Sequence, residues 1–156
     1  MAHTSANVLV HIVFSTKRRN PSIAVDMKGD LCAYLGGIVR ETGGVALIIN
    51  AMADHVHLLA RIPPAHGIAE VVRIVKANSS RWAHEKWPQH RGFAWQTGYG
   101  AFSVSQSNVA AVTKYIAEQE RHHRTTSFEE EYLQFLRKNG IAFDAKAAPH
   151  GLRRGL

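Results

Sequence analysis

The order in which strand-like and helix-like segments alternate constrains the fold of this chain more than any other feature of its sequence. Residues 8–15 are rich in β-branched and aromatic side chains, which is typical of a strand. Apolar residues at helical spacing then predict a helix over residues 23–41. Two more apolar runs, over residues 45–50 and 55–62, are predicted to be strands joined by a short turn.

The second half of the chain continues this alternation and adds helices. A helix is predicted over residues 67–87, and an interrupted strand over residues 93–104. Capping residues and apolar periodicity predict two further helices, over residues 107–122 and 127–139. The order β-α-β-β-α-β indicates a ferredoxin-like α+β fold, with an antiparallel sheet covered by two helices on one face. The other face is then available for a functional site.

Length and composition indicate one domain. The chain of 156 residues can bury one core, and we expect this domain over residues 1–144, with a basic, flexible tail over residues 145–156. No apolar run reaches the roughly 18 residues that a membrane-spanning helix needs. The N-terminus lacks the charged start of a signal peptide, and the sole cysteine, Cys32, excludes an internal disulfide. These features favour a cytoplasmic protein.

The chain is strongly basic, with a formal net charge of +7 and a pI of about 9.9. Such a charge favours polyanionic partners, and nucleic acid is the first of these to consider. A basic surface that serves only solubility is the alternative. The charge by itself does not separate DNA from RNA.

The tripeptide His55-Val56-His57 is the strongest chemical signal in the chain. Strand side chains alternate between faces, so both histidines point the same way while Val56 points into the core. Two imidazoles side by side on a strand can bind one divalent metal ion. Two nitrogens are too few for a structural zinc site, which normally has four protein ligands, so a site with open positions is favoured. The alternative is a pair of half-buried polar residues without a metal.

The predicted helix over residues 107–122 carries the next candidates. Tyr115 and Gln119 are four residues apart and therefore share one helical face. A phenol, with an ordinary pKa near 10, is a poor nucleophile at neutral pH unless charge is stabilised nearby. A divalent cation on the histidines can polarise a phosphodiester, and Gln119 can add a neutral oxygen ligand. Attack by Tyr115 would then give a phosphotyrosyl intermediate. The alternative is that Tyr115 packs at the margin of the core with its hydroxyl outward.

Taken together, these motifs resemble those of the HUH single-strand nucleases, and more narrowly those of the small tyrosine transposases of the insertion-sequence-200 (IS200-like) type. The resemblance extends over about residues 7–144. The segments that carry it, in the order of the family, are Val10–Lys17 with Arg18, Asp54–Leu59, Lys76–Ser80, Trp95–Val104, and Tyr115–Gln119 followed by His122-His123.

This resemblance implies a DNA transposase that works through single-stranded intermediates and recognises hairpins near the ends of its element. It implies that His55, His57 and Gln119 bind Mg²⁺ or Mn²⁺. Tyr115 would cut the DNA and keep a 5′-phosphate link, leaving a free 3′-hydroxyl. The family works as a homodimer, in which the tyrosine helix of one subunit can complete the histidine site of the other. Whether Tyr115 acts in its own subunit stays open.

Further residues are candidates for DNA contacts. Basic side chains can bind phosphates, and an exposed tryptophan can stack on an unpaired base. A solvated surface is the alternative for each basic residue, and Trp82 is expected in the core. The candidates are Lys17, Arg18, Arg19, Arg73, Lys76, Arg81 and Trp95.

Several alternatives stay open at this point. His11 lies either towards the site or in the core, and Asp54 either orients a histidine or caps a turn. Tyr99 and Tyr132 are rival nucleophiles. Two other functions are conceivable: a domesticated relative that processes repeated hairpins in a host genome, and a nucleic-acid-binding regulator without catalysis.

Overall fold

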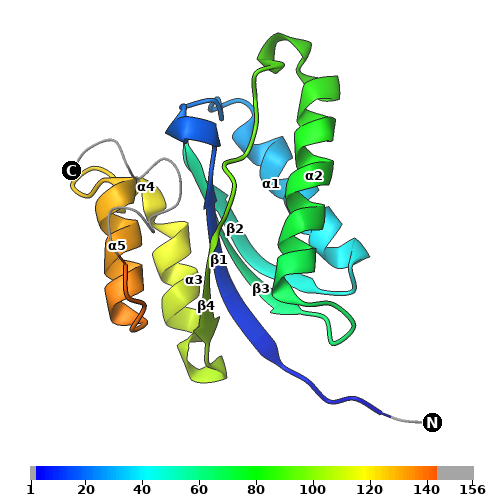
Figure 1. Ribbon diagram of the computed structural model, residues 1–156, viewed down its shortest axis with the longest axis vertical. Coiled ribbons are helices and arrows are strands. Elements are labelled where there is room, and N and C mark those ends of the chain that lie inside the picture. Colours follow the sequence, from blue (N-terminus) through cyan, green and yellow to red (C-terminus); the bar gives the residue numbers. More distant parts are fainter. Residues whose placement is uncertain (1–2, 144–156) are drawn as a thin grey trace.

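The computed structural model describes residues 3–143, and its elements follow the predicted order (Figure 1). The tail predicted over residues 145–156 lies outside the described residues. The elements are β1 (Val8–Ser15), α1 (Lys28–Glu41), β2 (Val45–Ala51), β3 (His55–Ile62), α2 (Ile68–Lys86), β4 (Gly100–Val104), α3 (Val109–Ala117), α4 (Gln119–His122) and α5 (Phe128–Lys138).

The four strands form one antiparallel sheet in the order β2-β3-β1-β4, with β1 and β3 in the centre. Helices α1 and α2 lie on one side of the sheet, and α3, α4 and α5 lie on the other (Figure 1). The ferredoxin-like α+β prediction is therefore confirmed. The additional helices cover the sheet face that the sequence left available.

Side-chain alternation along the central strands divides the core into two parts. Val10, Ile12 and Phe14 of β1 point towards α1 and α2, where they join the larger apolar cluster together with Val56 of β3. Val13 points to the other side and packs in a smaller cluster under α5. The prediction that Val56 faces the core is confirmed, and the histidines on either side of it face the smaller cluster.

Three predicted boundaries differ from the structure. Helix α1 begins at Lys28 and not at residue 23, because the backbone N–H of Ile23 donates to the carbonyl of Ala53. The predicted helix over residues 107–122 is broken at Glu118, whose φ of −96° and ψ of 21° separate α3 from α4.

The last predicted strand is also shorter than expected. Before β4, Trp95 forms only an isolated bridge with Thr16. The carbonyls of Gln96 and Gly98 accept hydrogen bonds from Lys76 and so take no part in the sheet.

Within residues 3–143, no helix is both long enough and apolar enough to cross a membrane.

The close approach at Gly44 gives a stability prediction. A Cβ atom on Gly44 would lie 2.7 Å from the backbone oxygen of Arg61, whereas one on Gly37, inside α1, would meet nothing within 4 Å. We expect Gly44→Ala to lower the free energy of unfolding by about 1–3 kcal/mol through overpacking. Gly37→Ala is the matched control and should leave it unchanged or raise it by up to about 1 kcal/mol. Urea unfolding of both variants measures this; equal values would contradict the steric explanation.

Candidate functional site

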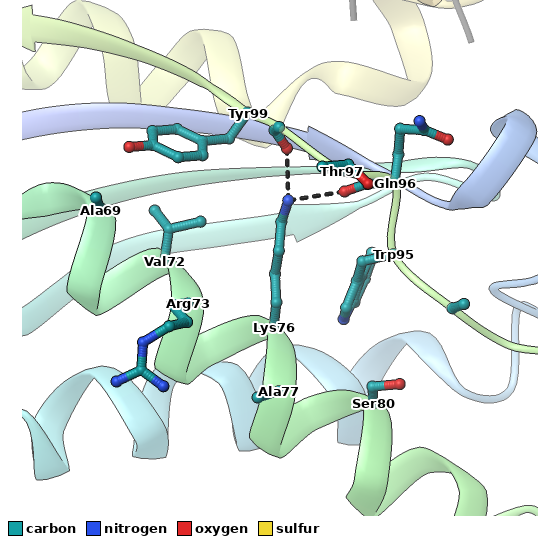
Figure 2. Close-up of a pocket in the computed structure, with 12 residues that line it drawn as sticks. Ala69, Val72, Arg73, Lys76, Ala77, Ser80, Trp95, Gln96, Thr97 and Tyr99 are labelled. Carbon is teal, nitrogen blue, oxygen red and sulfur yellow. Dashed lines mark hydrogen bonds between the residues drawn. The ribbon is translucent and has the colours of Figure 1, made fainter. Parts of the chain in front are cut away.

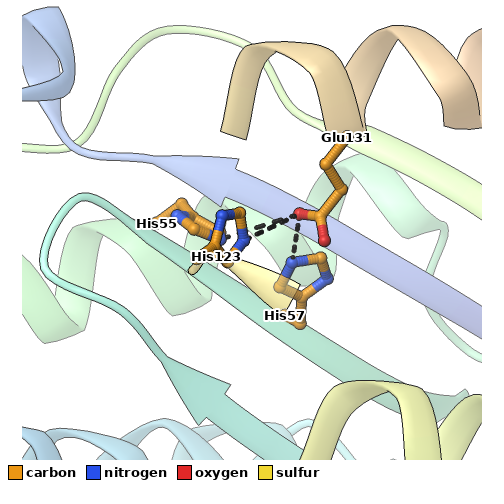
Figure 3. Close-up of side chains that lie close together, drawn as sticks. All are labelled: His55, His57, His123 and Glu131. Atoms are coloured by element: carbon orange, nitrogen blue, oxygen red, sulfur yellow. Dashed lines mark hydrogen bonds and ion pairs between the residues drawn. The ribbon is translucent and has the colours of Figure 1, made fainter. Parts of the chain in front are cut away.

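Four titratable side chains meet between the start of β3 and helix α5. His55 and His57 come from β3, His123 follows α4, and Glu131 projects from α5 (Figure 3). One ligand atom from each residue lies within 4.8 Å of the others, so the group could hold a metal ion. We call these four residues the histidine–glutamate cluster.

One carboxylate oxygen lies among the three imidazoles. Oε1 of Glu131 is 2.9 Å from Nε2 of His57, 3.4 Å from Nε2 of His123 and 3.7 Å from Nε2 of His55 (Figure 3). Both strand histidines and Glu131 are buried, with at most 3% of each exposed. The donor set of imidazole nitrogens and one carboxylate is suited to a divalent metal.

The orientation of His55 is controlled by its neighbour Asp54. Nδ1 of His55 lies 2.7 Å from a carboxylate oxygen of Asp54, and because a carboxylate only accepts, this nitrogen carries the proton. The other nitrogen, Nε2, is then a bare lone pair that points into the cluster, and it is buried without a hydrogen-bond partner. An unpartnered imidazole nitrogen backed by a carboxylate is the arrangement of a metal-ligating histidine. The geometry therefore fits the first of the two roles considered for Asp54, in which it orients a histidine, better than the second, in which it only caps a turn.

His57 is oriented by His11, which lies on the site side of β1 and is buried. Nε2 of His11 is 2.8 Å from Nδ1 of His57, while Nε2 of His57 donates to Glu131. Burial lowers the pKa of His11 to about 3 and also lowers the pKa of His57, so both rings are neutral. His11 donates to His57 in this structure, and it can accept instead when Nε2 of His57 becomes a metal ligand.

His123 is positively charged in this arrangement. Its Nδ1 lies 2.8 Å from the carbonyl oxygen of Thr126, and its Nε2 lies 2.9 Å from Oε1 of Gln119, so both nitrogens donate. The Glu131 carboxylate raises the pKa of His123. A metal ion that used Nε2 of His123 would have to displace a proton from it.

The two residues predicted on the tyrosine helix both reach the cluster. The hydroxyl of Tyr115 donates to Oε2 of Glu131, and its ring centroid lies 6.0 Å from that of His57. Burial and the Glu131 carboxylate together raise the pKa of Tyr115 well above its usual value. Gln119 is fully buried beside the cluster, with its amide oxygen held by His123. The structure therefore brings Tyr115, Gln119 and the histidine pair together within one chain.

Sequence reasoning did not identify Glu131 and His123 as members of the site. One signal was available for each: His123 is four residues after Gln119 and so shares its side of the chain. Glu131 is the acidic residue that falls in the apolar stripe of α5, between buried Phe128 and Tyr132. A charged residue within such a stripe is buried at a cost, so it indicates a specific partner.

The rival nucleophiles lie in other surroundings. Tyr132 is buried in the small apolar cluster with Val13 and Phe102, and burial raises its pKa. Tyr99 lines a separate cavity beside α2.

The predicted DNA-contact residues divide into surface and internal groups. Lys17, Arg18, Arg73 and Arg81 are exposed, whereas Arg19 is half-buried and forms an ion pair of 3.3 Å with Glu129.

Two of the candidates have structural contacts of their own. Lys76 is half-buried, and burial lowers its pKa to about 8 while its ammonium binds two carbonyls. Trp95 is held by a hydrogen bond of 2.9 Å from its ring nitrogen to Ser79. Trp82 packs against the larger core and stacks on Tyr34, with the ring centroids 4.2 Å apart.

Similarity to known proteins covers most of the chain. The family model described as "Transposase IS200 like" matches residues 4–119. The chain is 28% identical to the ISDra2 transposase TnpA of Deinococcus radiodurans, over 70% of this chain and 81% of that protein. It is also 28% identical to the transposase for insertion sequence element IS200 of Salmonella typhimurium, over 76% of this chain and 81% of that protein.

Two solved structures are similar to this one. A Deinococcus radiodurans chain described as a transposase superposes with a TM-score of 0.61 at 25% identity, covering 76% of this chain and 95% of that chain. A REP-associated tyrosine transposase bound to a REP hairpin superposes with a TM-score of 0.57, covering 79% of this chain and 74% of that one. At 11% identity, the second likeness supports the fold alone.

The buried carboxylate gives a prediction for stability against pH. Burial disfavours the charged form of Glu131, but the ion pair with His123 and the hydrogen bond from His57 outweigh it and hold the pKa of Glu131 below its ordinary value of 4.5. The unfolded chain therefore binds more protons in acid, and this stabilisation is lost as the pH falls through and below 4.5. We expect Glu131→Gln to weaken the fall in unfolding free energy between neutral and acid pH, measured in EDTA. Glu130→Gln, at an exposed position of α5, should keep the wild-type slope.

Metal binding can be tested without any assay of activity. A ligand that binds only the folded state raises the unfolding temperature, so we expect saturating Mn²⁺ to raise it by roughly 5–10 °C. His57→Ala and Glu131→Gln should lose most of this increase, because the first removes an imidazole ligand and the second replaces a carboxylate with a neutral amide. His66→Ala, which removes a surface partner of Glu70, is the control. An undiminished increase in His57→Ala would show that the ion binds elsewhere.

Proposed function

Because this chain belongs to the IS200-like transposase family, we propose that it cleaves and rejoins single-stranded DNA through a bond between Tyr115 and a 5′-phosphate. The observation that carries the proposal is the hydrogen bond from the Tyr115 hydroxyl to Glu131. Through it, the one tyrosine on α3 lies directly against the histidine pair of β3 in the same chain.

The proposed metal ion is Mg²⁺ or Mn²⁺, bound by His55 and His57. The bare, buried Nε2 of His55 supports this role. Gln119 is the oxygen ligand that the family resemblance implies; its amide oxygen accepts one hydrogen bond from His123 and keeps a second lone pair for an ion. When bound, such an ion supplies Lewis-acid polarisation of the phosphodiester.

The residues of this chain arrange the cleavage step around Tyr115. The phenol oxygen attacks phosphorus, forming a Tyr–O–P bond while the bond from phosphorus to the 3′-oxygen breaks. Oε2 of Glu131 accepts the hydrogen bond of the phenol and so orients its proton, which is lost to water as the new bond forms. The departing 3′-oxygen takes a proton from water to become a hydroxyl. Because the enzyme keeps a phosphodiester, the attack of a 3′-hydroxyl on it restores the tyrosine and joins a new strand.

The DNA is proposed to carry hairpins near the ends of the element. One structurally similar protein, the REP-associated tyrosine transposase, is bound to a hairpin, and the exposed basic side chains of this chain suit phosphate contacts. The homodimer that the resemblance implies and a cytoplasmic location both stay predictions. Within one chain, the tyrosine and the histidine pair already meet.

A covalent adduct provides the decisive test. We expect labelled single-stranded DNA with the end hairpin, together with Mg²⁺ or Mn²⁺, to give a protein–DNA adduct that survives denaturing electrophoresis. Tyr115→Phe should abolish it, because phenylalanine has no oxygen to form the bond. Tyr132→Phe, at a buried rival tyrosine, is the matched control that should keep it.

Two results would contradict the proposal in different ways. An adduct that persists in Tyr115→Phe would place the nucleophile elsewhere. A folded wild-type protein that binds the hairpin without any adduct would favour the non-catalytic, nucleic-acid-binding alternative.

A further inference from the structure

A second cavity lies on the opposite side of the sheet from the histidine–glutamate cluster. It is bounded by one face of α2 and by residues 94–99, which precede β4, and its volume is about 440 Å³ (Figure 2). That size is within the range of small-molecule pockets. None of the proposed catalytic residues lines it.

The walls of the cavity are suited to a flat, apolar ring. Trp95 is held rigidly, by its hydrogen bond to Ser79 and by edge-to-face contacts with Phe14 and Phe93 at centroid distances of 4.8 Å. Tyr99 lies across the cavity from it (Figure 2). Small side chains leave the space open between them; these are Ala69, Ala77, Ser80 and Ala94. A rigid aromatic wall costs little entropy when a base stacks on it.

The charge around the cavity is suited to an anion. Its lining contains Arg73 and Lys76 but no carboxylate. Arg73 is exposed on α2 and, among the described residues, forms no ion pair or side-chain hydrogen bond. Lys76 lies 5.9 Å from the centroid of the Tyr99 ring, with its ammonium fixed by the carbonyls of Gln96 and Gly98 (Figure 2). A ligand that has both a flat ring and a phosphate group would match the aromatic walls and the basic side chains of the cavity.

The cavity is connected to the catalytic face through the end of β1. Trp95 forms a bridge with Thr16, and Gln96 donates to the carbonyl of Ser15, which is the register partner of His55. Two strand spacings, roughly 10 Å, therefore separate the cavity segment from the start of β3.

The basic turn Lys17–Arg19 follows directly and is bonded to the same segment. The backbone N–H of Lys17 donates to the carbonyl of Ala94, and that of Arg18 donates to the side chain of Gln96. Arg18 and Arg19 have φ values of 59° and 54°, a left-handed conformation that non-glycine residues rarely adopt and that is enriched at functional sites. The turn thus presents the exposed side chains of Lys17 and Arg18 beside the cavity segment, while Arg19 is paired with Glu129 of α5.

We propose that this cavity binds the base of one unpaired nucleotide of the DNA, with the flanking phosphates on Arg73 and on the Lys17–Arg19 turn. The strand then passes the end of β1, at the Lys17–Arg19 turn, to reach Tyr115. This inference rests on the proposed function, because it assumes a single-stranded DNA substrate. A base held at one distance from the tyrosine would set the register of the strand, and so the phosphate that is attacked.

A comparison of two probes in the absence of divalent metal tests this proposal. One probe is a 20-nucleotide oligo(dT), and the other is an abasic strand with the same number of phosphates. We expect the wild-type protein to bind oligo(dT) about tenfold more tightly, which is the scale of one base stacked on an aromatic side chain. The double variant Ala77→Leu/Ser80→Leu fills the cavity and should bind both probes with the affinity that wild type has for the abasic strand.

The controls separate loss of the cavity from loss of the fold. Ala33→Leu, on the exposed face of α1, should keep the tenfold preference, and thermal unfolding should show that the double variant is folded. Light-induced crosslinks from 5-iododeoxyuridine in the oligo(dT) should map to Trp95 or Tyr99.

Three results would overturn the inference: a wild-type protein without preference, a double variant that keeps it, or crosslinks that miss both aromatic residues. Each of these can occur while the Tyr115 adduct still forms. A missing adduct with an intact preference would instead contradict the proposed chemistry.

Discussion

The buried carboxylate of Glu131 is the contact on which the arrangement of the site depends. It joins α5 to β3 through His57, to α3 through Tyr115, and to the segment after α4 through His123. A buried charge costs several kcal/mol unless it is paired and hydrogen-bonded, so these contacts must form together. The small apolar cluster under α5 adds only a few residues, which leaves the polar contacts to specify how the last helices dock on the sheet.

The same contact relates the charge of the cluster to the metal ion that it is proposed to bind. With Glu131 at its centre, the cluster is balanced by a protonated His123, and Tyr115 is held neutral by a nearby negative charge. A cation among the imidazoles would take over the pairing of Glu131 and favour the phenolate. The two strand histidines are oriented in advance for such a cation, because Asp54 fixes the ring of His55 and His11 fixes the ring of His57.

Strand alternation places the histidine–glutamate cluster and the proposed base-binding cavity on the two faces of one sheet. At the same end of the sheet, His55 and His57 of β3 face α5, while the segment bonded to β1 turns Trp95 towards α2. The Lys17–Arg19 turn lies where the two faces meet. In the proposed complex, a single strand of DNA that passes this turn would contact both faces.

The sequence by itself determined the order of strands and helices, the fold class, and the shared direction of His55 and His57. These properties are local: alternation of period two and helical spacing act within a few residues, and β1 and β3 begin and end close to where the pattern predicts. The likeness of the tyrosine helix to a known family also identified Tyr115 and Gln119, which the structure brings beside the histidine pair.

Only the tertiary structure decided that α5 covers this face and that His11, His123 and Glu131 join the site. Glu131 is separated from His57 by 74 positions, and no local pattern states which partner a buried charge will find. The partners of Glu131 are set by the docking of α5 on the sheet, because docking must bury apolar surface and satisfy every buried polar group at the same time.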